Sequence, residues 1–185
     1  LGLPLLLPLL APPPQWPDEG RFEVVAADIG QGTAVLVRTR GHLLLYDAGP
    51  RYSPQADAAQ RVLLPLLRAR GEHHIDLLML SHSDTDHVGG AASLLAQLPV
   101  RALSSSLPEG HALLRADVPH RRCLAGQAWD WDGVRFELLH PSPGDFVPVY
   151  PQFGLGTINN GVIHAEESVG TSWYEWTYLE ITDTV

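Results

Sequence analysis

Residues 75–90 constrain the fold more than any other part of the chain, because an apolar run is followed at once by a loop of potential metal ligands. Residues 75–80 read IDLLML, which suits a short strand buried on both faces. The next ten residues read SHSDTDHVGG and contain four imidazole or carboxylate side chains, those of His82, Asp84, Asp86 and His87. Open α/β sheets bind ligands at the carboxyl ends of their strands. The pattern therefore predicts an α/β domain with a site at this edge.

A divalent metal ion in a hydrolase needs several nitrogen or oxygen ligands and one coordination position left for water. His82 and Asp84 alternate along the loop and could address one ion, while the adjacent Asp86 and His87 address a second. Two ions about 3.5–4 Å apart clamp a phosphoryl or acyl group and supply hydroxide at neutral pH. We therefore expect two divalent metal ions, zinc or manganese, between which these ligands do not discriminate. The alternative is a polar surface loop that only contacts solvent.

The rest of the first 144 residues reads as a mixture of strands and helices. Three β-rich runs come first, over residues 22–28, 33–39 and 42–47. A helix is expected over 56–70, with a kink at Pro65. After the ligand loop, the sequence predicts a helix over 91–97, a strand over 100–103 and a hairpin over 129–138. The expected class is α/β (α+β).

The first 20 residues differ from those that follow. They begin LGLPLLLPLLAPPPQWP, with neither Met nor a basic stretch at the start, so they fit a signal peptide poorly. The apolar run is also too short to cross a bilayer, which needs about 20 residues. We interpret residues 1–20 as the end of a membrane segment that begins upstream, followed by a Pro-rich linker. A disordered apolar N-terminus is the alternative.

Charge and cysteine content limit the partners. The net charge is −9, which argues against a general nucleic-acid-binding surface, since phosphate contacts need clustered basic residues. All 12 basic residues are Arg, however, and Arg suits bidentate phosphate contacts. DNA or RNA is therefore allowed as a substrate, and no stable complex with nucleic acid is expected. The one cysteine, Cys123, excludes an internal disulfide and a Cys-based zinc cluster.

The last 41 residues have a different composition. Residues 145–185 contain six acidic residues and no Arg, whereas residues 1–144 hold 15 acidic residues and all 12 Arg. Such a change marks a boundary or a foreign segment. We therefore expect a domain over 21–144 and an atypical acidic tail over 145–185. The tail is interpreted either as a truncated or replaced second half or as a frameshifted or interrupted gene end.

Several motifs carry a family resemblance. The loop SHSDTDHVGG resembles the His-x-His-x-Asp-His signature of the metallo-β-lactamase fold, with Asp84 where the second histidine usually stands. The flanking stretches are ADIGQGTAVLVRTRGHLLLYDAGPRYS and AGQAWDWDGVRFELLHPSP. With them, residues 21–142 resemble the extramembrane metallo-β-lactamase-like domain of the ComEC-type competence proteins, which are inner-membrane DNA-uptake channels.

The resemblance implies a fold and a set of site residues. The fold is an αββα sandwich, of which only the N-terminal part is expected to be complete. The implied metal ligands are His82, Asp84, Asp86 and His87, and Asp86 would also orient the attacking water as the catalytic residue. Asp47 would hold the ligand loop by hydrogen bonds. The remaining candidate ligands are His140 and, less favoured, His164.

The implied function is that of a nuclease acting on the DNA strand that is not imported. Single-stranded DNA would be its transient substrate, and the membrane channel of the same full-length protein its partner. The domain would lie outside the inner membrane, on the periplasmic or extracellular face.

Two alternatives to the nuclease stay open. One is a hydrolase of thioesters, lactones or β-lactams, and the other is a catalytically inactive module associated with a DNA channel. A complete domain of this kind would continue with an Asn-rich stretch, an apolar strand and a Gly-Asp that bridges the metals. Apart from the faint match at 159–161, residues 145–185 show none of these, which supports the inactive module.

Overall fold

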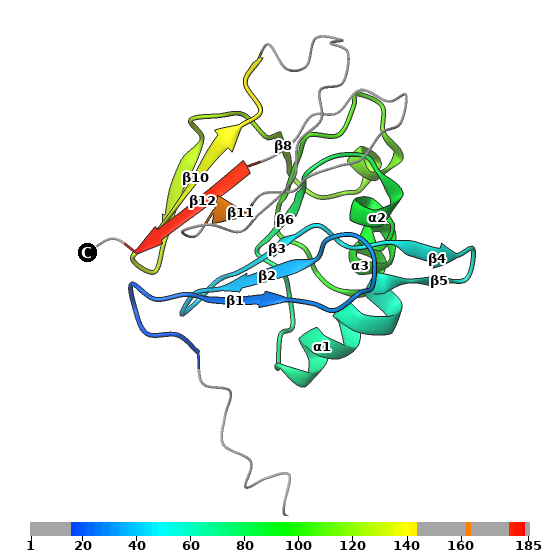
Figure 1. Ribbon diagram of the computed structural model, residues 1–185, viewed down its shortest axis with the longest axis horizontal. Coiled ribbons are helices and arrows are strands. Elements are labelled where there is room, and N and C mark those ends of the chain that lie inside the picture. Colours follow the sequence, from blue (N-terminus) through cyan, green and yellow to red (C-terminus); the bar gives the residue numbers. More distant parts are fainter. Residues whose placement is uncertain (1–15, 144–161, 164–177, 184–185) are drawn as a thin grey trace, which may run out of the picture.

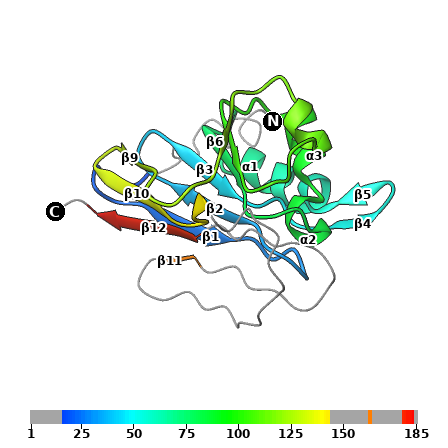
Figure 2. The ribbon, with the colours of Figure 1, turned by 90° about the horizontal axis from the view of Figure 1, so that it is seen from above.

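The computed structural model describes residues 16–143, 162–163 and 178–183, which form two packed sheets and a layer of helices (Figures 1 and 2). The larger sheet has the strand order β1-β2-β3-β6-β7-β8. Its strands are β1 (Glu23–Ala26), β2 (Val35–Arg38), β3 (Leu43–Tyr46), β6 (Leu77–Leu80), β7 (Leu103–Ser105) and β8 (His120–Arg122). The first three strands are antiparallel, whereas β3, β6, β7 and β8 are parallel to one another. The mixed α/β class is thus confirmed.

The helices follow the strands on one face of this sheet. A π-helical turn (Ala59–Leu63) runs directly into α1 (Leu64–Ala69), and α2 (Thr85–Val88), α3 (Ala91–Gln97) and a 3-10 turn (Ala112–Arg115) come later. The prediction of a helix from residue 56 was wrong at its start. Residues 51–57 instead form a hairpin of β4 (Arg51–Ser53) and β5 (Ala56–Asp57). The helix begins after Asp57. The Asp57 side chain accepts a hydrogen bond from Gln60 N and so satisfies a free N–H group of the first turn, as a helix cap does.

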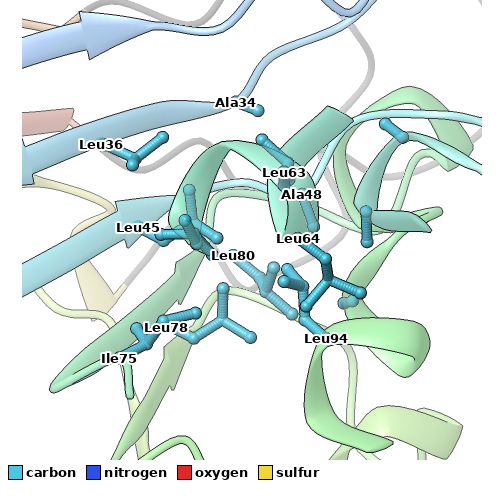
Figure 3. Close-up of a cluster of buried hydrophobic side chains, with 14 of the residues drawn as sticks. Ala34, Leu36, Leu45, Ala48, Leu63, Leu64, Ile75, Leu78, Leu80 and Leu94 are labelled. Carbon is cyan, nitrogen blue, oxygen red and sulfur yellow. The ribbon is translucent and has the colours of Figure 1, made fainter. Parts of the chain in front are cut away.

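The core has two parts because the central strands are buried on both faces. Alternate residues of β2, β3 and β6 point to opposite sides of the sheet. On the helix side, the buried leucines include Leu36, Leu45, Leu63, Leu78, Leu80 and Leu94 (Figure 3). On the other side, Val37, Leu44 and Met79 pack against the second sheet. The prediction that residues 75–80 contain a strand buried on both faces is therefore confirmed.

The second sheet contains a strand that the sequence did not predict. Its order is β11-β12-β10-β9, with β9 (Ala128–Trp131), β10 (Val134–His140), β11 (Val162–Ile163) and β12 (Tyr178–Asp183) all antiparallel. The expectation that residues 145–185 lack an apolar strand was wrong, since β12 pairs with β10 along its length. Leu179 and Ile181 are buried between the sheets, while Thr182 is exposed. β12 thus alternates as a strand covered on one face does, whereas the prediction looked for a continuous apolar run.

Within the described residues, helices cover only the outer face of the larger sheet, so three layers of the expected αββα sandwich are seen (Figure 2). The boundary at residue 144 stays a prediction. The described part of the chain has no helix with the length and apolar character needed to cross a bilayer. The expected end of a membrane segment falls largely on residues 1–15, which lie outside the described residues.

Candidate functional site

The ligand loop and Asp47 lie at the same edge of the larger sheet. β3 and β6 are parallel neighbours, with Tyr46 opposite Met79, so the residues that follow both strands meet at their carboxyl ends. Asp47 comes directly after β3, and its backbone N–H donates to Met79 O at 2.8 Å. Ser81 comes directly after β6 and starts the ligand loop. The topology therefore places the loop against Asp47.

The Asp47 side chain ties the loop down from beneath. It is fully buried and accepts hydrogen bonds from Ser81 N at 2.8 Å, Ser81 Oγ at 2.7 Å and His87 Nδ1 at 2.7 Å. These donors supply the hydrogen bonds that a buried carboxylate requires. Asp47 has a φ of 59°, in the left-handed region that Asp tolerates better than most residues do. The carboxylate thus fixes both ends of the segment from Ser81 to His87.

The imidazoles of His82 and His87 lie side by side. Their ring centroids are 3.9 Å apart, and His82 Nδ1 lies 2.9 Å from Ser81 Oγ. His82 Nε2 is 3.9 Å from Asp84 Oδ2, and His87 Nε2 is 3.8 Å from Asp86 Oδ2. Two donors that each bind one ion at about 2 Å lie no more than about 4 Å apart. The loop therefore forms two His–Asp pairs, each with the donor type and spacing that suit one divalent ion.

Exposure differs between the two kinds of ligand. The side chains of His82 and His87 are 2% and 4% exposed, whereas those of Asp84 and Asp86 are 23% and 36% exposed. Burial lowers the pKa of His82, and the nearby His87 lowers it further, which keeps the imidazole neutral as a metal ligand must be. Burial also opposes a charge on His87, but the hydrogen bond and charge of Asp47 outweigh it and raise the pKa of His87.

Two glycine-bearing loops hold the ligand loop through its backbone. Thr33 N donates to Asp86 O at 3.2 Å, and a Cβ atom at Gly32 would collide with that same carbonyl oxygen. On the other side, Ala48 N donates to His87 O at 2.7 Å. The segments that contain DIGQG and DAG therefore support the backbone of the ligand loop. Gly32 must be glycine because it lies so close to the carbonyl oxygen of Asp86.

Ser81 and Thr33 were not predicted as site residues. Ser81 stands at the start of the quoted motif, where a hydroxyl next to a potential ligand was the signal that could have identified it. Thr33 contributes only its backbone, so no side-chain pattern points to it.

Some predicted ligands are not brought to the loop. Within the described residues, no three side chains of His, Cys, Asp or Glu are arranged to hold one ion, so His140 does not complete either His–Asp pair. His140 ends β10, before a cis bond to Pro141, and its role as a ligand stays a prediction. His164 lies outside the described residues.

Comparison with known proteins gives a family match and several relatives. The profile of the metallo-beta-lactamase superfamily matches residues 27–171. Competence protein ComA of Neisseria gonorrhoeae is 39% identical over 129 residues, which are 70% of this chain and 17% of that protein. ComE operon protein 3 of Bacillus subtilis is 33% identical in an alignment 177 residues long that covers 84% of this chain and 22% of that protein. The chain therefore spans less than a quarter of either relative, and the resemblance to the competence proteins is confirmed.

Solved structures with similar folds are more distant. The metallo-beta-lactamase SMB-1, bound to 2-mercaptoethanesulfonate, has a TM-score of 0.47 and 17% identity over 68% of this chain and 53% of that one. CmlA, a diiron beta-hydroxylase from Streptomyces venezuelae, has a TM-score of 0.43 and 20% identity over 68% of this chain and 25% of that one. These likenesses concern the fold alone.

Proposed function

This chain belongs to the metallo-β-lactamase superfamily, a family of the metal-dependent hydrolase type, and we propose that it is a nuclease domain that hydrolyses single-stranded DNA. The observation that carries the proposal is the presence of two His–Asp pairs on one loop, with the imidazoles buried and the carboxylates partly exposed. The name of the relative ComA concerns competence, and this favours DNA over a thioester, lactone or β-lactam as substrate.

The metal ions are part of the proposal. His82 and Asp84 would hold one zinc or manganese ion, and Asp86 and His87 the other, with water filling the remaining positions. Bound ions would act as Lewis acids and lower the pKa of a bound water. Asp47 would keep the His87 ring oriented through Nδ1, so that Nε2 faces Asp86. Asp86, the more exposed of the two carboxylates, would accept a hydrogen bond from the attacking water and orient it.

The proposed setting follows from the competence relatives. The domain would be the extramembrane part of a membrane DNA-uptake protein, on the periplasmic or extracellular face, with the channel of the same protein as its partner. It would degrade the strand that is not imported. The net charge of −9 fits a substrate that is cleaved and released rather than held.

Metal binding and DNA cleavage test the proposal together. We expect titration with Mn²⁺ or Zn²⁺ to load at least one ion per chain, and a labelled single-stranded oligonucleotide to be cut only with metal present. Substitutions of residues that only orient a metal ligand lower metal affinity or activity by about 10–100-fold. His87 is itself a proposed ligand, so His87→Ala should lower the cleavage rate by at least about 100-fold. The exposed His73 offers a matched control, so His73→Ala should leave cleavage unchanged.

Less than one ion per chain at saturation would contradict the enzyme and support the inactive module. Bound metal with turnover of a lactone or thioester, but not of DNA, would instead support the other hydrolase.

A further inference from the structure

The β4–β5 hairpin projects from the domain beside the ligand loop (Figures 1 and 2). It starts against α2, the short helix that contains Asp86 and His87, because a Cβ atom at Gly89 would collide with the backbone N of Arg51. Gly90 N also donates to Gly49 O, two residues before the hairpin. The hairpin and the ligand loop are therefore neighbours in main-chain contact.

Tyr52 contacts the same loop that contacts the backbone of Asp86. Its hydroxyl donates to Ile29 O at 2.7 Å, within the DIGQG loop. The same loop leads into Thr33, whose N–H donates to Asp86 O. Tyr52 is 42% exposed, so part of its ring is open to a ligand. The guanidinium carbon of Arg61 lies 5.4 Å from the centre of the Tyr52 ring, so a cation is already stacked on the ring.

The positive charge beside this ring is not neutralised within the hairpin. Arg51 stands opposite Asp57 across the two strands. The Asp57 carboxylate is buried and engaged elsewhere, with Ser93 Oγ at 2.6 Å and Gln60 N at 2.9 Å. Arg51 and Arg61 are both exposed, and neither forms an ion pair with a described residue. Their charges are thus available to an anion at the edge of the site.

We infer that Arg51, Tyr52 and Arg61 form a contact surface that transiently binds a nucleic acid single strand beside the ligand loop. The inference rests on the proposed function and names the residues that would give it its substrate class. Bases of an unpaired strand stack on aromatic side chains, while Arg binds the phosphates on either side. A double strand offers no unstacked base to Tyr52, so the surface selects single strands.

Binding without cleavage tests this directly. The 185-residue chain is titrated against a fluorescein-labelled thymidine oligonucleotide at low ionic strength, with a chelator present, and anisotropy is recorded. Tyr52→Ala should weaken binding by about tenfold, as loss of one stacked base does, and Tyr52→Phe should restore it. Arg51→Ala should weaken binding and reduce the salt slope by about 1. Thermal unfolding of each variant shows that the fold is kept.

Arg21 provides the matched control, because it is exposed and has no ion pair with a described residue. It comes two residues before β1, a strand that starts at the opposite end of the molecule from the β4–β5 hairpin (Figure 1). Arg21→Ala should change binding less than twofold. An equal loss in Arg21→Ala and Arg51→Ala would overturn the inference, because attraction would then depend on overall charge. It is also overturned if Tyr52→Ala binds like the wild type, or if the wild type does not bind.

The contact surface and the nuclease proposal can fail independently of each other. Hairpin-dependent binding by a chain that never cleaves DNA would support the contact surface and contradict the nuclease. If the chain cleaves DNA, the hairpin variants should raise KM with little change in kcat. Cleavage with an unchanged KM in those variants would leave the nuclease standing and overturn the contact surface.

Discussion

At the scale of single residues, Asp47 is the side chain on which the ligand loop depends. It accepts hydrogen bonds from Ser81 N, Ser81 Oγ and His87 Nδ1 while completely buried. Removing it would leave buried donors without an acceptor, at a cost of about 1–3 kcal/mol for each such group. The same carboxylate orients the His87 ring, so stability and metal affinity should depend on it together.

Asp47→Ala should lower metal affinity by about 10–100-fold, because His87 would lose the group that orients it. It should also lower the free energy of unfolding, since Ala is strained at a φ of 59°. Asp47→Asn tolerates that backbone and keeps one oxygen acceptor, so it should unfold less readily than the Ala variant. Metal titration and urea unfolding measure the two effects. Wild-type affinity in Asp47→Ala would contradict the role of Asp47.

Asp132 is a second residue with a measurable effect, on stability rather than on the site. Burial raises its pKa, but hydrogen bonds from Thr39 Oγ1, His42 and Gly41 N outweigh burial and lower the pKa to about 2, from an ordinary value of 3.8. The unfolded chain therefore binds more protons than the folded one between these values. Stability from Asp132 is present above pH 4 and is lost as the pH falls toward 2.

Asp132→Asn should lower the free energy of unfolding by about 1–2 kcal/mol at neutral pH, because the hydrogen bonds to a charged acceptor are weakened. Asn tolerates the φ of 53° at this position, so backbone strain does not contribute. The difference between wild type and variant should shrink as the pH falls below 4. Urea unfolding at a series of pH values measures this, and a constant difference would contradict the assignment.

At the scale of elements, the ligand loop is shaped by its neighbours more than by its own sequence. Gly32 allows the DIGQG loop to reach the backbone of Asp86, where Thr33 N donates its hydrogen bond. Gly30, in the same loop, also has a positive φ, of 81°, but a Cβ atom there would meet nothing within 4 Å. Substituting Gly30 by Ala therefore tests backbone strain alone, whereas substituting Gly32 adds a collision with Asp86 O.

Gly32→Ala should displace the Asp86 backbone and lower both metal affinity and cleavage, while Gly30→Ala should cost only the strain of a left-handed residue, about 1–2 kcal/mol. Metal titration of the two variants makes the comparison. If both variants bind metal with equal affinity, contact with the DIGQG loop does not position the metal ligands.

At the scale of the whole molecule, β12 connects the acidic tail to the fold. Ile181 is 3% exposed and packs between the sheets, whereas the next residue, Thr182, faces solvent. Ile181→Ala should lower the free energy of unfolding by about 2–4 kcal/mol, as truncations in a core do. Thr182→Ala is the matched control and should change it by less than about 0.5 kcal/mol. Equal values in urea unfolding would mean that the tail does not belong to the domain.

Much of the first sheet could be predicted because its strands are apolar on both faces, as in residues 75–80. The helix over 91–97 was also predicted with its bounds. β7 lies farther along than predicted, at Leu103–Ser105, because Ser104 and Ser105 are polar although buried. β8 was missed because an edge strand with exposed His120 and Arg121 has no apolar pattern.

The side chains of the candidate site could be predicted from the sequence, but the backbone contacts that hold them in place could not. The pairing of His82 with Asp84 and of Asp86 with His87 was anticipated from their spacing, and the structure places those side chains near each other. Hydrogen bonds from backbone groups, such as those of Thr33 and Ala48, depend on loops brought together by the sheet. A sequence pattern of side chains carries no signal for such contacts.

Besides the Asp47 carboxylate, Thr33 and Ala48 hold the ligand loop at its main chain, through Asp86 O and His87 O. Its path is consequently set by parts of the chain that never touch an ion. The same scaffold can then carry different donor atoms without being rebuilt, so a swap at Asp84 would alter which ion is preferred and leave the architecture intact. A peptide cut from residues 75–97 would, by the same reasoning, lose its shape.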